Sequence, residues 1–234
     1  MSLKGSLKQP LYVILIGLVL TVIVAVESLY PIPWSPYFLI YAALAIAIPL
    51  YTKSYKFGSF SDNFRGHKLK IFIVVLVVGI ILTIGLDTLT NTILTNAGLA
   101  DNPYYSLPAA LVALAESAGI KFGITTTTAM LIYAFYIIIW APIGEELFYR
   151  GYVYGELKEK YGLLGATLIS TFFFGIRHAT HMLFLPTYPL IAGLYWAFSA
   201  FVFGLVMVYA YEKTESLYVP MIVHLIVNLI QAFM

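Results

Sequence analysis

The stretch Pro142-Ile143-Gly144-Glu145-Glu146-Leu147-Phe148-Tyr149-Arg150-Gly151 sets two adjacent carboxylates and an arginine directly after residues 125–141, which contain no Asp, Glu, Lys or Arg. Ionisable groups inside a membrane span cost roughly 2.5–3.5 kcal/mol each, and those that occur usually serve a function. Glu146 and Arg150 are spaced i,i+4 with the acid first, the favourable order for a helical ion pair. Glu145 is turned about 100° from Glu146 around the helix. The pattern therefore predicts one structural ion pair and a second carboxylate available for another role.

The composition of the chain predicts a membrane protein. Of the 234 residues, 61% are hydrophobic and 10% are charged, whereas a soluble domain has about 25% charged and 45–50% apolar residues. We expect an all-α, polytopic transmembrane bundle that forms a single integral membrane domain over residues 1–234, with the motif-bearing core at 125–234. The absence of cysteine excludes a thiol nucleophile and thiolate metal ligands. No basic block suggests binding to nucleic acid.

Seven apolar stretches are interpreted as spans. They cover about residues 10–29, 38–51, 71–94, 125–156, 163–183, 190–211 and 217–233. Pro142 lies inside the fourth of these and predicts a kink rather than a helix end, because neighbouring groups can satisfy the freed carbonyl. Residues 107–118 are apolar but shorter than the ~20 residues that a span requires. They re-enter the membrane, lie at its surface or form an eighth span.

The basic residues predict the orientation of the bundle. With seven spans and a cytoplasmic N-terminus, the inner segments hold ten lysine or arginine residues and the outer segments hold only Lys121. This asymmetry is the positive-inside pattern. We expect an integral protein of a prokaryotic plasma membrane. From the helical rise of about 1.5 Å per residue, Glu145 is expected toward the cytoplasmic half of the membrane.

Further polar residues occur in the fifth and seventh predicted spans. His178 and His181 are spaced i,i+3 and share one helix face, and His224 and Asn228 share another face at i,i+4. An intramembrane His or Asn most often forms an interhelical hydrogen bond worth about 0.6 kcal/mol. We favour this role or a supporting one for His181, while for His224 with Asn228, taken alone, structural and catalytic roles are equally favoured. Arg177 points to a different face from His178, where it pairs with an acid or extends to the membrane surface.

If the three spans are neighbours, their polar groups suit hydrolysis by an activated water. Glu145 in a low dielectric can act as a general base, and His178 can hold the same water. His224 and Asn228 can donate hydrogen bonds to a developing oxyanion, an effect worth roughly 2.7–4 kcal/mol per donor in other hydrolases.

Three short motifs follow one another, each on its own predicted span: Glu-Glu-x-x-x-Arg, Phe-x-x-x-His and His-x-x-x-Asn. Their residues are Glu145, Glu146, Arg150, Phe174, His178, His224 and Asn228. In this order the motifs resemble the CAAX protease and bacteriocin-processing family, also called the Abi family, which includes the type II CAAX prenyl endopeptidases. The resemblance covers roughly the C-terminal half of the chain.

This resemblance implies an intramembrane, metal-independent, glutamate-type endopeptidase. By analogy with the family, Glu145 and His178 would activate water, and His224 and Asn228 would form the oxyanion site. The substrate implied is a peptide or lipidated protein, with C-terminal processing of prenylated CAAX-type proteins as one case and bacteriocin processing or self-immunity as others. The expected partners also include membrane lipids, but no nucleic acid, metal or other cofactor.

The resemblance gives Glu146 and Arg150 a supporting role.

Other functions stay open at this point. A Zn-dependent membrane protease could take Glu145, His178 and His224 as ligands, although the His-Glu-x-x-His helix pattern is absent. A transporter could use the acids and histidines as a proton relay, but no inverted repeat supports this. The third alternative is an immunity protein that retains the motifs without hydrolysis.

Overall fold

A computed structural model describes most of the chain. The described residues are 3–29, 36–96, 98, 111, 112, 115, 116, 119, 120, 122–183 and 190–233. Regular secondary structure in this part is entirely helical, which confirms the predicted all-α membrane bundle. Residues 107–118 fall largely outside the described residues, so the choice among their predicted placements stays open.

The first part of the chain forms two apolar helices and a long third one. Its elements are α1 (Leu3–Leu7), α2 (Pro10–Leu29), α3 (Pro36–Thr52), the 3-10 turn η1 (Ser61–Phe64) and α4 (Gly66–Asn96). The second part contains the motif-bearing stretch. Its elements are α6 (Thr126–Phe135), η3 (Tyr136–Trp140), α7 (Ala141–Glu145), η4 (Glu146–Tyr154), α8 (Gly155–Leu183), α9 (Leu190–Thr214) and α10 (Tyr218–Gln231).

The helical run from α6 to α8 is two antiparallel rods joined at Gly162. Its apolar segment, Thr126–Thr180, has 55 residues, more than twice the ~20 residues that cross a bilayer. Gly162 has φ +68° and ψ −179°, which breaks the helix. The chain then returns, and the hydroxyl of Ser170 donates a hydrogen bond to the carbonyl of Tyr149 at 2.6 Å.

With this division, the described residues form seven apolar rods. Two of the other rods, Gly66–Ile93 and Gly193–Thr214, are also long enough to cross a membrane. Pro10–Val26, Ile40–Thr52 and Tyr218–Gln231 are shorter and apolar. The predicted spans agree with these rods to within a few residues at most ends. The expected polytopic architecture is therefore present in the described part of the chain.

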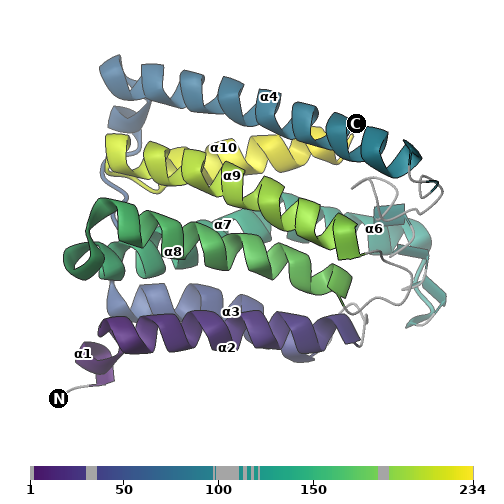
Figure 1. Cartoon of the computed structure of the whole chain (residues 1–234), viewed down its shortest axis with the longest axis horizontal. Helices are drawn as coiled ribbons and strands as arrows, with labels where there is room; N and C mark the ends of the chain where they lie inside the picture. Colours follow the sequence, from purple (N-terminus) through teal and green to yellow (C-terminus); the bar gives the residue numbers. More distant parts are fainter. Residues whose placement is uncertain are drawn as a thin grey trace.

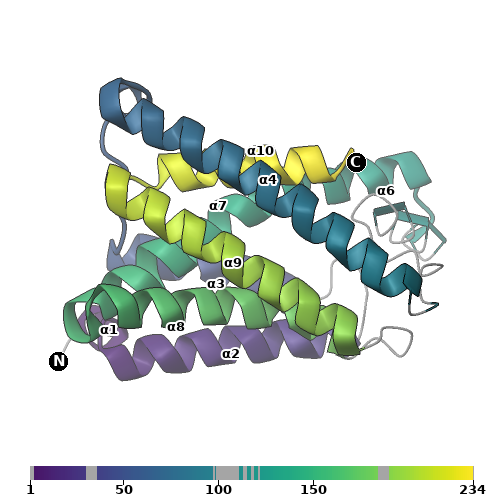
Figure 2. The same cartoon turned by 45° about the horizontal axis from the view of Figure 1, so that its top comes forward.

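The rods lie roughly along one direction, with the motif-bearing helices in the middle of the bundle (Figure 1). Helices α2 and α3 form one edge and α4 the opposite edge, while α8 and α9 run side by side between them (Figure 2). The close approach of α8 to α9 depends on Gly175, since a Cβ atom there would lie 2.7 Å from the carbonyl oxygen of Ala197. The acid-bearing segment, which consists of α7 and η4 and carries Glu145 and Glu146, contacts α3, and its α7 part also contacts α10.

The segments predicted to carry cytoplasmic lysines gather at one end of the bundle. This end is formed by α1, the connection from α3 to α4, the Gly162 turn and the end of α9, all on the left in Figure 1. Lys8 pairs with Glu156 at 2.9 Å, and Lys158 pairs with Glu212 at 2.6 Å. The arrangement agrees with the predicted charge asymmetry, whereas the orientation in a membrane stays a prediction.

Gly162 allows a direct test of the turn between the two rods. Its backbone conformation is one that essentially only glycine adopts, at a cost of about 1–3 kcal/mol to other residues. We expect Gly162→Ala to lower the thermal stability in detergent. Gly85→Ala is the matched control, because a Cβ atom would meet nothing within 4 Å at either position, but only Gly162 has a positive φ. Equal stability of the two variants would contradict the proposed constraint.

Candidate active site

Glu146, together with its ion-pair partner Arg150, joins three rods. Its Oε1 atom accepts a hydrogen bond from Nη1 of Arg150 at 3.1 Å and another from Nδ1 of His224 at 2.8 Å. The side chains of Glu146 and Arg150 are fully buried, and Arg150 also donates to the carbonyl of Gly204 at 3.3 Å. The predicted i,i+4 ion pair is therefore present, and it extends to α9 and α10.

The guanidinium of Arg150 is also held by close packing against Phe174 and Gly204. Its central carbon lies 4.3 Å from the centre of the Phe174 ring, which gives a cation–π contact. A Cβ atom at Gly204 would lie 3.2 Å from Nη2 of Arg150. The small residue on α9 thus makes room for the arginine beside the helix backbone.

Glu145 has an arginine of its own. Its Oε1 atom lies 2.5 Å from Nη1 of Arg177 on α8, while its Oε2 atom lies 3.8 Å from Nε2 of His224. The sequence predicted that Glu145 would not depend on Arg150 and that Arg177 would pair with an acid or extend to the membrane surface. The first of these two alternatives for Arg177 is present, but the sequence did not identify Glu145 as the acid. Arg177 directly precedes His178 in the same span. This proximity was the one sequence signal that could have placed it at the site.

The contacts of His178 indicate its protonation. Its Nδ1 atom lies 2.7 Å from the carbonyl oxygen of Phe174, and its Nε2 atom lies 3.3 Å from Nη1 of Arg177. A carbonyl only accepts and a guanidinium only donates. Nδ1 therefore carries the hydrogen and Nε2 the lone pair, as in the neutral imidazole. The half-buried ring packs edge-on against Phe174 with centroids 4.6 Å apart.

His224 faces both carboxylates. Its Nδ1 atom bonds to Glu146, and its Nε2 atom points toward the oxygen of Glu145 that Arg177 does not hold. The rings of Phe174 and Phe203 pack edge-on against it, with centroids 5.9 Å and 5.1 Å away. The side chain is about 5% exposed, so its orientation is fixed by packing as well as by hydrogen bonds.

Asn228 lies one turn beyond His224 and satisfies a carbonyl left free by a proline. The segment η3 is π-helical, so each carbonyl there bonds to the N–H five residues later. For Ile137 that residue is Pro142, which has no N–H. Nδ2 of Asn228 donates to the carbonyl of Ile137 at 2.9 Å instead. This contact uses one of its two N–H groups and leaves the second for another acceptor.

A buried aromatic layer lies between the polar cluster and the lysine-bearing end. Phe148, Tyr149, Tyr152 and Tyr154 are each at most 1% exposed. Tyr41 on α3 belongs to the wall of the site, since the guanidinium of Arg177 lies 5.0 Å from the centre of its ring. No sequence pattern pointed to Tyr41, because it is one of many aromatic residues in a span without a motif.

The described part of the chain does not bring the predicted zinc ligands to one point. No group of three or more His, Asp or Glu side chains in the described part of the chain is arranged to hold a metal ion. The zinc hypothesis required Glu145, His178 and His224 to converge on one point, but Arg177 contacts both Glu145 and His178. His181 is part of α8, whereas its side chain lies outside the described residues.

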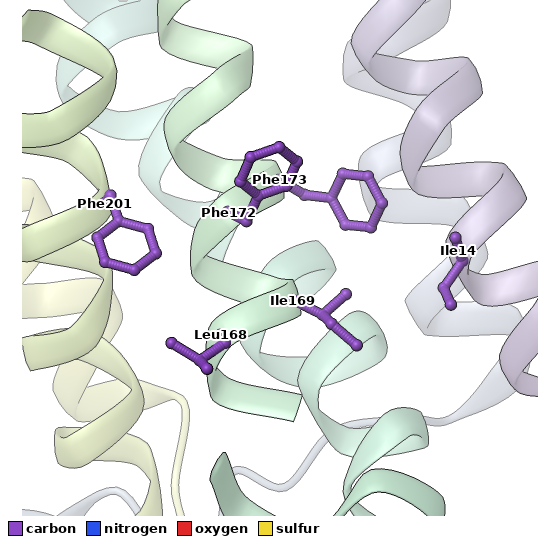
Figure 3. Close-up of a pocket in the computed structure, with 6 residues that line it drawn as sticks. All are labelled: Ile14, Leu168, Ile169, Phe172, Phe173 and Phe201. Atoms are coloured by element: carbon purple, nitrogen blue, oxygen red, sulfur yellow. The ribbon is translucent and has the colours of Figure 1, made fainter. Parts of the chain in front are cut away.

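A separate apolar groove opens on the bundle surface. It has a volume of about 500 Å³ and is lined by side chains from α2, α8 and α9. Figure 3 shows these side chains, which are Ile14, Leu168, Ile169, Phe172, Phe173 and Phe201. The groove holds no polar lining residue, so it is not part of the polar cluster.

The buried ion pair should be far more important for stability than an exposed one. Arg150→Met leaves the Glu146 carboxylate buried beside His224 alone, and such a loss typically costs about 3–5 kcal/mol. Lys158→Met is the control, because the Lys158–Glu212 pair is 44% and 26% exposed and surface pairs contribute about 1 kcal/mol or less. Denaturant unfolding in mixed micelles measures both. Similar losses in the two variants would refute the structural role.

The bond from Asn228 to Ile137 should depend on Pro142. Asn228→Ala leaves the part-buried carbonyl of Ile137 without this donor and is expected to cost about 1 kcal/mol. In a Pro142→Ala background the restored N–H can bond to the helix carbonyls, so the same change should cost less. A double-mutant cycle measured by thermal unfolding tests this coupling. Identical costs in both backgrounds would argue against it.

Part of this chain is similar to known membrane peptidases. Residues 127–230 match the family model described as Type II CAAX prenyl endopeptidase Rce1-like. "Putative membrane peptidase YdiL" from Bacillus subtilis (strain 168) is 35% identical over 92 residues, which make up 38% of this chain and 32% of that protein. The chain therefore aligns with about a third of the length of this relative. No solved structure matches.

The matched segment contains all seven motif residues, from Glu145 to Asn228. The resemblance of this chain to the type II CAAX prenyl endopeptidases of the CAAX protease and bacteriocin-processing family is therefore confirmed over residues 127–230.

Proposed function

We propose that this protein is an intramembrane endopeptidase that hydrolyses a peptide bond with a water molecule activated by Glu145 and His178. The observation that carries the proposal is the convergence of two carboxylates, two guanidinium groups and two imidazoles from three rods into one largely buried cluster. The family match over residues 127–230 supports the same class of enzyme.

The proposed reaction begins at Oε2 of Glu145, the oxygen that Arg177 does not hold. Oε1 is held by Arg177, which leaves Oε2 to accept a proton from a bound water. The neutral His178 accepts a hydrogen bond from the same water when its Nε2 lone pair exchanges the 3.3 Å contact with Nη1 of Arg177 for that water. The water oxygen then bonds to the carbonyl carbon of the substrate, and the carbonyl π electrons move onto its oxygen. A tetrahedral oxyanion forms.

His224 and Asn228 are suited to stabilise this oxyanion. The Glu146 carboxylate accepts from Nδ1 of His224, and in the imidazolium form of this ring the Nε2–H group can donate as well. The second N–H of Asn228 provides another donor. On collapse, the C–N bond breaks and the leaving nitrogen takes the proton from Glu145, which restores the carboxylate. The rigid hydrogen bonds of both donors suit them to stabilise charge without reorganisation.

The substrate proposed is a membrane-associated peptide or lipidated protein. C-terminal processing of a prenylated CAAX-type substrate is the specific case that the family match supports. The buried aromatic layer separates the site from the lysine-bearing end, so we expect the scissile bond to arrive laterally from the bilayer. We propose the plasma membrane of a prokaryote, a cytoplasmic N-terminus and a site in the cytoplasmic half as its setting.

Removal of the proposed base or its imidazole partner should abolish cleavage. We expect Glu145→Ala and His178→Ala to lose turnover of a panel of prenylated CAAX peptides, unprenylated CAAX peptides and internal membrane peptides, measured by mass spectrometry on purified protein. Glu159→Ala and His67→Ala are the matched controls, because both side chains are exposed and lie outside the site. Each site variant must elute as a folded protein.

The panel also separates the competing functions. Near-normal turnover in Glu145→Ala or His178→Ala would overturn the assigned roles. Cleavage that stops after exhaustive chelation and returns with Zn²⁺ would instead indicate a zinc protease. If neither variant changed the biological effect of the protein, an immunity function without hydrolysis would be favoured.

A further inference from the structure

Arg177 is a buried cation that touches both members of the proposed catalytic pair. Its side chain is 8% exposed. Nη1 lies 2.5 Å from Oε1 of Glu145 and 3.3 Å from Nε2 of His178. A guanidinium Nη atom carries two hydrogens, so one nitrogen can donate to both groups at once. Neither of these contacts is supplied by Arg150, which belongs to Glu146.

We propose that Arg177 is a positioning residue that holds Glu145 and His178 in register for the reaction. This inference rests on the proposed function, since it assigns a role relative to the same carboxylate and imidazole. By binding Oε1, Arg177 turns Oε2 of Glu145 toward His224. By donating to Nε2, it selects the neutral form of His178 that has its hydrogen on Nδ1.

Tyr41 fixes the arginine from the opposite side. The guanidinium lies 5.0 Å from the centre of the Tyr41 ring, which is within the range of a cation–π contact. Tyr41 is 3% exposed and belongs to α3, a helix that carries none of the three motifs. The catalytic register thus depends on a rod from the N-terminal half of the chain as well as on α7, α8 and α10.

A purely structural ion pair would explain the burial of Arg177 but not its bond to His178. In a structural pair the arginine neutralises one carboxylate, and any cation with similar packing serves. Here the same nitrogen also contacts the imidazole. Arginine and lysine are not equivalent at such a site, because lysine offers a flexible point charge rather than a planar set of donors. Arg177→Lys should therefore keep the charge and lose part of the register.

The first experiment needs no substrate. N,N′-Dicyclohexylcarbodiimide is apolar and labels membrane carboxyl groups in their protonated form. Nη1 of Arg177 lies 2.5 Å from Oε1 of Glu145 and shields that carboxyl group, so we expect little labelling of Glu145 in the wild-type protein, a several-fold increase in Arg177→Gln, and a near-wild-type level in Arg177→Lys. Tandem mass spectrometry of the labelled peptide distinguishes Glu145 from Glu146. Arg65→Gln, at an exposed arginine, is the control, and Glu145→Gln in the Arg177→Gln background should remove the new signal.

The second experiment separates positioning from binding. With a cleaved peptide of the panel, Arg177→Gln should lower kcat about 100-fold, the size of effect that a displacement of about 1 Å produces, with KM unchanged. Arg177→Lys should fall between this variant and the wild type. If Arg177→Gln does not fold, Arg177→Lys still decides the matter, because an unchanged kcat there would overturn the inference.

The two experiments have distinguishable failures. Labelling of Glu145 that does not increase in Arg177→Gln, in a protein that still cleaves peptides, would refute the role of Arg177 and leave the peptidase assignment intact. The expected labelling pattern in a protein that cleaves no peptide, by contrast, would refute the proposed function and support the contact between Arg177 and Glu145.

Discussion

The structure depends on a single carboxylate oxygen that accepts hydrogen bonds from side chains on two different rods. Oε1 of Glu146 accepts from Arg150 one helical turn away and from His224 on α10. A charge buried in this way must be paired, because the penalty for removing it from water is several kcal/mol. The pairing holds α10 against the acid-bearing segment, and the remaining groups of the site are arranged around this junction.

The neighbouring carboxylate differs only in its direction around the helix, and this difference separates the two roles. Glu146 is fully buried, and its Oε1 atom is shared between Arg150 and His224, so its carboxylate is fixed in place. Glu145 is bonded at one oxygen and faces an imidazole with the other. Two adjacent residues of the same type thus meet different surroundings, because successive side chains on a helix point about 100° apart.

Patterns local to one helix could be predicted from the sequence, whereas contacts between helices could not. The seven spans, the ion pair of Glu146 with Arg150 and the shared face of His224 and Asn228 all follow from spacing along the chain. The pairing of Arg177 with Glu145 depends on how two rods are rotated against each other. The hydroxyl of Ser170 on α8 donates to the carbonyl of Tyr149 and ties these two rods together, a contact that no periodicity encodes. The contribution of Tyr41 was hidden for the same reason, because it reaches the site across an interface.

The position of His224 on α10 has a consequence for biogenesis. The segment from Thr126 to Thr180 folds back on itself at Gly162, so Glu145, Arg177 and His178 can come together while this hairpin enters the bilayer. The imidazole that completes the cluster comes from a helix that follows α9 in the chain. A ribosome-bound intermediate that lacks α10 would hold the proposed general base without the proposed oxyanion donors. If the proposed mechanism holds, the protein would therefore be inactive during its own insertion and gain activity only when α10 docks.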